Sequence, residues 1–174
     1  MSRDFKRLAD EHGGRIYTLA RYLLGRHEDA EDVTQEILVR LWRNHDRIDP
    51  AKTRAWVAQV TRNLVIDTSR QRKLRAAVFA ENAQVEASVV AVSTAAGPER
   101  AAIDAELRAA LEAAIAKLDE PYRSILIMRE IQDLPYQDIA DAMAMPLGTV
   151  KVYLHRARRR VREEVCTGEY DAFA

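Results

Sequence analysis

Apolar residues recur every three or four positions between residues 5 and 75. This interval places them on one face of an α-helix, so the pattern predicts helices rather than strands. The period is interrupted at Gly25 and over residues 44–53, where Asp49-Pro50 is typical of a loop. Three helices are therefore expected in this part of the chain, and the third runs out into the basic sequence SRQRKLR.

The helical period returns near the end of the chain, from Ile103 to Leu118. Asp119-Glu120-Pro121 is typical of a cap followed by a new helix. Asp133-Leu134-Pro135 ends that helix, and a short helix then leads to a turn at 145–148. The last helix is expected from about Pro146 to Glu164. Its apolar side consists of four residues at helical spacing: Val150, Leu154, Ala157 and Val161.

Residues 76–100 have a different character from both flanks. They carry little charge, many small residues and no firm period, and they finish with Gly97-Pro98. This composition is typical of a linker. We therefore expect an all-α fold in which two small helical domains are joined by a flexible linker. The predicted ranges are a first domain at 1–75, the linker at 76–100, a second domain at 101–168 and a tail at 169–174.

Composition narrows the class of protein. Only six glycines and five prolines among 174 residues agree with a helical fold. The single cysteine, Cys166, cannot form an internal disulfide, which favours a reducing compartment. No apolar run approaches the roughly 18 residues of a membrane span, and the N-terminus is charged. A cytoplasmic protein without membrane insertion is expected.

Charge is balanced overall but strongly segregated. Lys plus Arg and Asp plus Glu each total 27, so the formal net charge is zero. Residues 28–36 have a net charge of −5, residues 62–75 of +4, and residues 149–162 of +6 with no acid. Blocks of this kind indicate charged partners rather than a fold.

The two C-terminal helices are typical of a helix-turn-helix. The final helix is apolar on one side. Lys151, His155 and Arg158 lie together on another side, with Arg156 and Arg159 beside them. A major groove admits one α-helix, where cations meet phosphates and guanine edges. The alternative is a solvated basic helix that binds nothing. The run without acids, directly after a turn with Gly148, favours DNA.

Residues 29–44 combine an acidic side with an apolar side. Asp32, Gln35 and Glu36 lie a turn apart and are expected to form one polar surface for a basic partner helix. Two alternatives are an ordinary amphipathic helix and a metal site that includes His27. No second His or Cys stands at ligand spacing, so no metal is expected.

Residues 53–75 mix Trp56 and Asn63 with several cations on one helix. Aromatic rings that stack and cations that hold a backbone suit single-stranded nucleic acid, although Trp56 alone is better explained as a core residue. For the cations a nucleic-acid face is favoured; these are Arg70, Arg72, Lys73 and Arg75. Nothing in the chain predicts a cofactor or a catalytic group, so no enzyme is expected.

Together these segments resemble the extracytoplasmic-function (group 4) sigma factors of bacterial RNA polymerase, in the sigma-70 family. DAEDVTQEILVRLW resembles region 2.2 and AWVAQVTRNLVIDTSRQRK resembles regions 2.3–2.4. The sequence from Leu118 to Val161 resembles region 4. The order of these segments, with a poorly patterned linker between them, is more specific than any one of them.

The resemblance implies a promoter-specificity subunit that binds core RNA polymerase and promoter DNA. Core polymerase would be contacted by Asp32, Gln35 and Glu36. A second set would open the −10 element and hold its non-template strand: Arg62, Asn63, Asp67 and Arg70. The loop at 44–53 would take up a flipped base. The −35 duplex would be read by a third set: Lys151, Val152, His155, Arg156 and Arg159. By resemblance alone, an anti-sigma factor is also expected.

The chain departs from the family pattern at three places. Val152-Tyr153 stands where Ser-Arg is usual, Pro135 replaces a Ser or Thr, and Asp133 stands where Gly is common. Two other functions compete with promoter recognition. A sigma mimic would titrate an anti-sigma factor without binding DNA, but it needs neither a basic recognition helix nor Asn63. A two-domain repressor would not explain the acidic helix.

Overall fold

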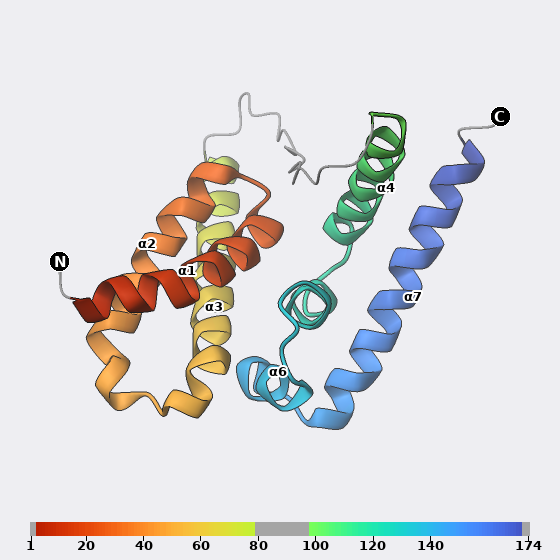
Figure 1. Cartoon of the computed structure of the whole chain (residues 1–174). Helices are drawn as coiled ribbons and strands as arrows, with labels where there is room; N and C mark the ends of the chain where they lie inside the picture. Colours follow the sequence, from red (N-terminus) through yellow and green to blue (C-terminus); the bar gives the residue numbers. More distant parts are fainter. Residues whose placement is uncertain (1–2, 79–97, 172–174) are drawn as a thin grey trace.

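The computed structural model describes residues 3–78 and 98–171, and its ordered elements are helices (Figure 1). Helices α1, α2 and α3, with the short turns η1 and η2 between α2 and α3, form a first group, and the elements from Pro98 onward form a second group. Their bounds are α1 Arg3–Leu24, α2 His27–Asn44, η1 His45–Arg47, η2 Pro50–Lys52, α3 Thr53–Val78, α4 Pro98–Ala116, α5 Tyr122–Leu126, η3 Ile127–Ile131, α6 Tyr136–Met143 and α7 Leu147–Asp171.

Helices α1, α2 and α3 form the first helical unit because each buries the apolar face that its period predicts. This core consists of Leu8, Ile16, Ala20, Ala30, Val33, Ile37, Leu41, Val57 and Val65. Gly25 joins α1 to α2 at a φ of 75°, a conformation that costs glycine little. The start of α2 is tied to α3 by an ion pair between Asp29 and Arg72. The predicted loop at 44–53 is present and contains the two 3₁₀ turns, η1 and η2.

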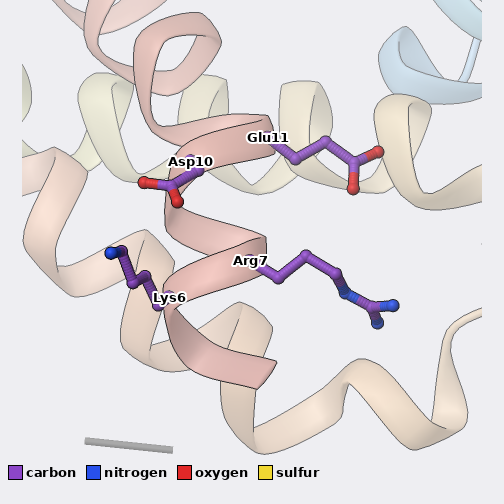
Figure 2. Close-up of a pocket in the computed structure, with 4 residues that line it drawn as sticks. All are labelled: Lys6, Arg7, Asp10 and Glu11. Atoms are coloured by element: carbon purple, nitrogen blue, oxygen red, sulfur yellow. The ribbon is translucent and has the colours of Figure 1, made fainter. Parts of the chain in front are cut away.

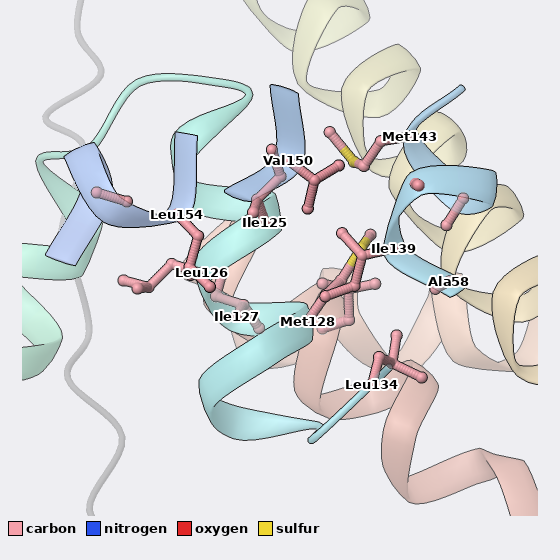
Figure 3. Packing of buried hydrophobic residues seen from close by; sticks show 14 of the residues in the cluster. Ala58, Ile125, Leu126, Ile127, Met128, Leu134, Ile139, Met143, Val150 and Leu154 are labelled. Carbon is pink, nitrogen blue, oxygen red and sulfur yellow. The ribbon is translucent and has the colours of Figure 1, made fainter. Parts of the chain in front are cut away.

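Helices α4 to α7 form the second helical unit around a larger apolar cluster. Figure 3 shows Ile125, Ile127, Ile139 and Leu154 converging in its centre. Asp133 closes the turn after η3 at a φ of 49°, so the residue that replaces the usual glycine is held in the left-handed region. The helix that precedes this turn ends in the π turn η3.

Helices α6 and α7 form the predicted helix-turn-helix. Pro135 precedes α6 and provides no side-chain cap. Ala144 then ends α6 in the left-handed conformation, at a φ of 50°, so that the chain reverses into α7. Val150, Leu154 and Ala157 are buried as expected, whereas Val161 is only half-buried.

The two helical units pack against each other, chiefly through α3 and α6. Leu19 from α1 and Ala58 from α3 belong to the apolar cluster of the second unit. In Figure 3, Ala58 lies beside Ile139 of α6. Segments far apart in the sequence are therefore side by side in the fold.

Several predicted boundaries fall inside helices. Helix α3 continues to Val78, α4 begins at Pro98 and α7 continues to Asp171, beyond the expected start of the tail. The remainder of the predicted linker, residues 79–97, lies outside the described residues. The all-helical organisation in two units is confirmed.

His12 is a buried titratable side chain of α1, with 2% of its surface exposed. Its Nδ1 atom has no hydrogen-bond partner, and its Nε2 lies 3.6 Å from Glu11. Burial lowers the pKa of His12 below 6.5; Glu11 opposes this shift, while Arg15 and Arg54 add to it. The fold therefore favours the neutral imidazole.

This environment makes stability depend on pH. As the pH falls, the unfolded chain takes up a proton at His12 near pH 6.5, before the folded chain does. The contribution of His12 to stability should therefore be fully present above that pH and should be lost as the pH falls toward the lowered pKa of the folded chain. Urea unfolding of the wild type and of His12→Gln, at pH about 7.5 and about 5.5, measures the difference. The wild type should lose more stability, at up to about 1.4 kcal/mol per pH unit from this one group. Parallel pH profiles would contradict the assignment.

Candidate nucleic-acid and protein interfaces

The outward side of α7 carries all five residues predicted to read duplex DNA. The buried stripe of α7 packs into the second unit, which leaves the opposite side in solvent. Each of the five is exposed, and their spacing places them on one face: Lys151, Val152, His155, Arg156 and Arg159. The structure therefore brings this predicted set together.

Two other cations of the basic run are held by their own domain. The Arg158 guanidinium donates to Glu130 Oε1 at 2.6 and 3.1 Å, and this hydrogen bond is the main reason why the pKa of Arg158 is raised. Arg160 lies over the ring of Tyr122, 4.4 Å from its centroid. These two side chains orient α7 within the second unit. Arg158 and Arg160 are therefore less available to a partner than the net charge of residues 149–162 suggests.

Tyr136, at the start of α6, lies between cations from two elements. Arg129 stacks on its ring at 5.0 Å from the centroid, and the Lys151 ammonium lies 5.9 Å from the same centroid. Cation–π contacts of this kind stabilise a charged side chain in one orientation. Sequence reasoning did not identify Tyr136, because its relation to Lys151 arises only when α6 and α7 fold together.

The second predicted set divides over two sides of α3. Asn63, Asp67 and Arg70 are exposed and follow one another at intervals of four and three, so they share one stripe. Trp56 lies two turns earlier on the same stripe and is half-buried against the core of the first unit. Arg62 is turned toward the second unit, where its Nε lies 3.5 Å from Glu120 Oε2.

A cavity of about 460 Å³ lies beside the loop between α2 and α3. Loop residues, α1 and the start of α3 form most of its lining, and α6 adds one carboxylate, Asp138. Figure 2 shows a neighbouring pocket on α1, where Arg7 and Glu11, which also line the cavity beside the loop, extend to one side of their helix, while Lys6 and Asp10 extend to the other. The loop is thus accompanied by a preformed recess with charged walls.

The third predicted set lies on the exposed side of α2. Asp32, Gln35 and Glu36 are all exposed, and Glu36 forms an ion pair with Arg40. The same side continues with two apolar residues, Val39 at 38% and Trp42 at 42% exposed. Sequence reasoning missed both, although their spacing of four and seven residues from Gln35 was a usable signal. An exposed tryptophan next to a polar face is typical of a protein contact.

A second cavity, of about 680 Å³, runs between α4 and α7 and reaches α1. Its floor is apolar and includes Leu111, Ile115, Val161 and Val165, while charged residues from both helices form its rim. Leu111 is 38% exposed, so α4 does not bury the whole apolar face that its period predicts. We refer to this cavity as the α4–α7 groove.

Two absences bear on the alternatives raised by the sequence. Within residues 3–78 and 98–171, no helix is long and apolar enough to cross a membrane. The same residues contain no group of three potential metal ligands. His27, which suggested the metal alternative, is instead in contact with Tyr17 at 2.7 Å and Glu31 at 3.3 Å.

Comparison with known proteins covers both units. Residues 8–75 match the family model for Sigma-70 region 2, and residues 108–161 match that for Sigma-70, region 4. The chain is 32% identical over 157 residues to the ECF RNA polymerase sigma factor SigE of Mycolicibacterium smegmatis, covering 90% of this chain and 59% of the relative. It is 31% identical over 165 residues to SigW of Bacillus subtilis, covering 92% and 88%.

A solved structure shares the fold. The sigma factor RpoE of Bartonella quintana, crystallised with the anti-sigma factor NepR, superposes with a TM-score of 0.76. The superposition covers 94% of this chain and 98% of that chain, at 22% sequence identity.

The α7 geometry distinguishes two neighbouring arginines. Arg159→Ala should weaken binding to duplex DNA and reduce the slope of log affinity against log salt by about one unit, because an exposed cation that neutralises one phosphate releases about one counterion. Arg158→Ala should leave the slope almost unchanged, since Arg158 donates two hydrogen bonds to Glu130, whereas Arg159 makes only a longer contact, at 3.6 Å, with the exposed Glu163. A fluorescence titration at three salt concentrations compares the two, and equal slopes for both variants would refute the distinction.

Proposed function

Because the chain belongs to the ECF RNA polymerase sigma factors of the sigma-70 family, we propose that its three exposed faces are the contacts through which it directs core polymerase to promoters. Sigma factors initiate transcription as specificity subunits and have no enzymatic activity of their own. As a partner of core polymerase, the protein acts in the cytoplasm. The observation that carries the proposal is that each of the three predicted contact sets has exposed members on a single helix face.

The exposed side of α2 is our proposed contact with core polymerase. Asp32, Gln35 and Glu36 supply acceptors for a basic partner surface, and Val39 and Trp42 supply apolar area on the same side. A polar patch beside an exposed aromatic residue combines orientation with burial. We therefore extend the predicted contact along α2 to Trp42.

The exposed stripe of α3 and the neighbouring cavity are our proposed −10 site. Asn63 can donate to and accept from the edge of an unpaired base, while Arg70 is placed for a backbone phosphate. The cavity beside the loop is large enough to take an extruded base, and extrusion costs a few kcal/mol that a preformed recess helps to offset. Arg62 faces Glu120 here and is proposed to reach DNA only when that ion pair is broken.

The exposed face of α7 is our proposed −35 reader. As the second helix of a helix-turn-helix, α7 is the element that enters a major groove. Lys151 and Arg156 are suited to guanine edges or phosphates, and Val152 offers an apolar contact to a thymine methyl. Val152 and Tyr153, which depart from the family pattern, have different surroundings. Val152 is exposed, whereas Tyr153 packs on Tyr122, with 4.9 Å between the ring centroids.

The α4–α7 groove is our proposed site for an anti-sigma factor. The similar RpoE from Bartonella quintana was crystallised with one, NepR. The groove has an apolar floor with charged rims, and it suits the apolar face of an amphipathic helix. Tyr22 of α1 also lines it, so a helix bound there would touch both helical units.

A sigma mimic remains the second candidate. Titration of an anti-sigma factor would use the α4–α7 groove but would not require an exposed basic face on α7. Run-off transcription with purified core polymerase separates the two functions. A sigma factor starts transcripts from a cognate promoter, whereas a mimic starts none and only relieves inhibition of another sigma factor.

The core contact predicts a loss of affinity without a loss of fold. Replacing Gln35 and Glu36 together by Ala should weaken binding to core polymerase about tenfold or more, because hydrogen bonds to charged groups contribute about 1.5–3 kcal/mol each. The matched control replaces Gln137 and Glu106 by Ala, the same residue types at exposed positions of the second unit. Fluorescence titration with core enzyme measures both, and equal affinities would contradict the contact on α2.

The −10 contact predicts a defect in melting. Asn63→Ala should reduce open-complex formation on a native promoter but spare a template that is already mismatched over −10, because base capture is no longer needed to open it. Permanganate footprinting of both templates with the reconstituted holoenzyme measures the contrast. An equal loss on the two templates would assign Asn63 a structural role.

A further inference from the structure

We infer that Tyr136, at the start of α6, is a positioning residue for promoter recognition, because its ring holds the Lys151 ammonium where it meets a guanine edge of the −35 duplex rather than a phosphate. This inference rests on the −35 contact proposed above for the exposed face of α7. It adds to the determinants of sequence preference a residue that lies outside α7 and outside all three predicted contact sets.

Lys151 carries a charge that does not select a base by itself. A lysine ammonium is a compact point charge on a flexible stem of four carbons, so it binds phosphate readily and lacks the rigid fork with which arginine fits guanine. Lys151 is exposed and lies in the second turn of α7, which begins at Leu147. Residues near the beginning of a recognition helix are those that meet base edges. Its position therefore suits a base, while its chemistry leaves the choice between base and phosphate open.

The ring of Tyr136 supplies the missing constraint. The Lys151 ammonium lies over this ring, 5.9 Å from its centroid, and α6 lies against the beginning of α7 (Figure 1). Attraction between an ammonium and the face of an aromatic ring restricts the orientations of the lysine side chain. An aromatic face balances the charge without the strong acceptor of a carboxylate, so the ammonium can still donate to a base edge.

Tyr136 is itself fixed by its surroundings. Its ring packs on the apolar cluster of the second unit, and Arg129 of η3 lies over it at 5.0 Å from the centroid. Arg129 is anchored in turn, because it donates to the Leu134 carbonyl oxygen at 2.8 Å and lies 3.2 Å from Asp133 Oδ1. A ring held in this way restricts a flexible side chain without being displaced by it.

The neighbouring charges distinguish Lys151 from the other cations around it. Arg129 is paired with Asp133, and Arg158 is paired with Glu130. Within residues 3–78 and 98–171, no carboxylate forms an ion pair with Lys151, whose contact is the Tyr136 ring. Lys151 is therefore the cation of this group that DNA engages without breaking an ion pair.

NMR of the free full chain tests the contact. The ε-methylene protons of Lys151 should lie upfield of those of the exposed Lys52, because they are placed over an aromatic ring, and Lys151→Gln assigns their signal. Tyr136→Phe keeps the ring and should keep this shift, whereas Tyr136→Leu should lose it. A wild-type Lys151 signal at the position of Lys52 would overturn the inference, whether or not any variant folds.

Fluorescence titration of the full chain with duplex DNA tests the role of the contact. One duplex carries the −35 element of a promoter that the wild-type holoenzyme transcribes in a run-off assay, and in the others each G·C pair of that element is replaced in turn by A·T. Lys151→Gln should reduce the preference for one G·C pair about tenfold. Tyr136→Leu should reduce the preference for the same pair about threefold, the size expected of one exposed cation–π contact. Tyr136→Phe should match the wild type.

A double-mutant cycle separates positioning from general damage to the fold. In the Lys151→Gln background, Tyr136→Leu should have no further effect on the preference. In the background of Arg156→Ala, an exposed cation of α7 outside the contact, the effect of Tyr136→Leu should be unchanged. Duplexes that lack the selected G·C pair should bind Tyr136→Leu and the wild type equally. An equal loss of affinity on every duplex, or additive effects with Lys151→Gln, would assign the ring a structural role alone and overturn the inference.

Failure of this inference and failure of the proposed function give different results. A preference that changes with Lys151→Gln but not with Tyr136→Leu would contradict positioning by the ring and leave the −35 contact intact. A wild-type chain with which core polymerase starts no transcript, or duplex binding that does not respond to Lys151→Gln, would instead contradict the proposed function, even where the NMR shift is present.

Discussion

The burial of one apolar face on every helix decides which residues this protein can offer to its partners. In α7, Val150, Leu154 and Ala157 must point into the second unit, so the side that carries Lys151 and His155 must point outward. The same constraint in α2 leaves an acidic side in solvent. Recognition surfaces are therefore positioned by the core, and a change that rotates a helix would move a whole contact set at once.

Electrostatics then divides the charged residues between the fold and the partners. Arg158, Arg160 and Arg72 are each engaged by a neighbour, namely Glu130, the Tyr122 ring and Asp29. Of these contacts, the exposed ion pair between Arg158 and Glu130 contributes little to stability, typically below about 1 kcal/mol, but such contacts orient helices. A chain with zero net charge can therefore present an acidic face and two basic faces without strong overall repulsion or attraction.

Helices and their exposed faces could be predicted from the sequence because both follow from the spacing of residues along one helix. Asn63, Asp67 and Arg70 are an example, since intervals of four and three define a stripe on any α-helix. Contacts between helices carry no such local signal. Arg15 and Gln132 meet across 117 positions, and the turn of Arg62 toward Glu120 depends on that docking. The groove beside α4 was not predicted, because the period marks Leu111 as apolar but does not show that it is left partly exposed among the described residues.

The contact between the two helical units is small enough for a bound partner to change its equilibrium. Ala58, Leu19, one reciprocal hydrogen-bonded pair and the ion pair between Arg62 and Glu120 together stabilise this contact by only a few kcal/mol, since each net hydrogen bond contributes about 1 kcal/mol. A partner shifts such an equilibrium only by its difference in affinity for the two states. A helix bound in the α4–α7 groove would also contact Tyr22 of the first unit and would therefore add to the contact between the two units.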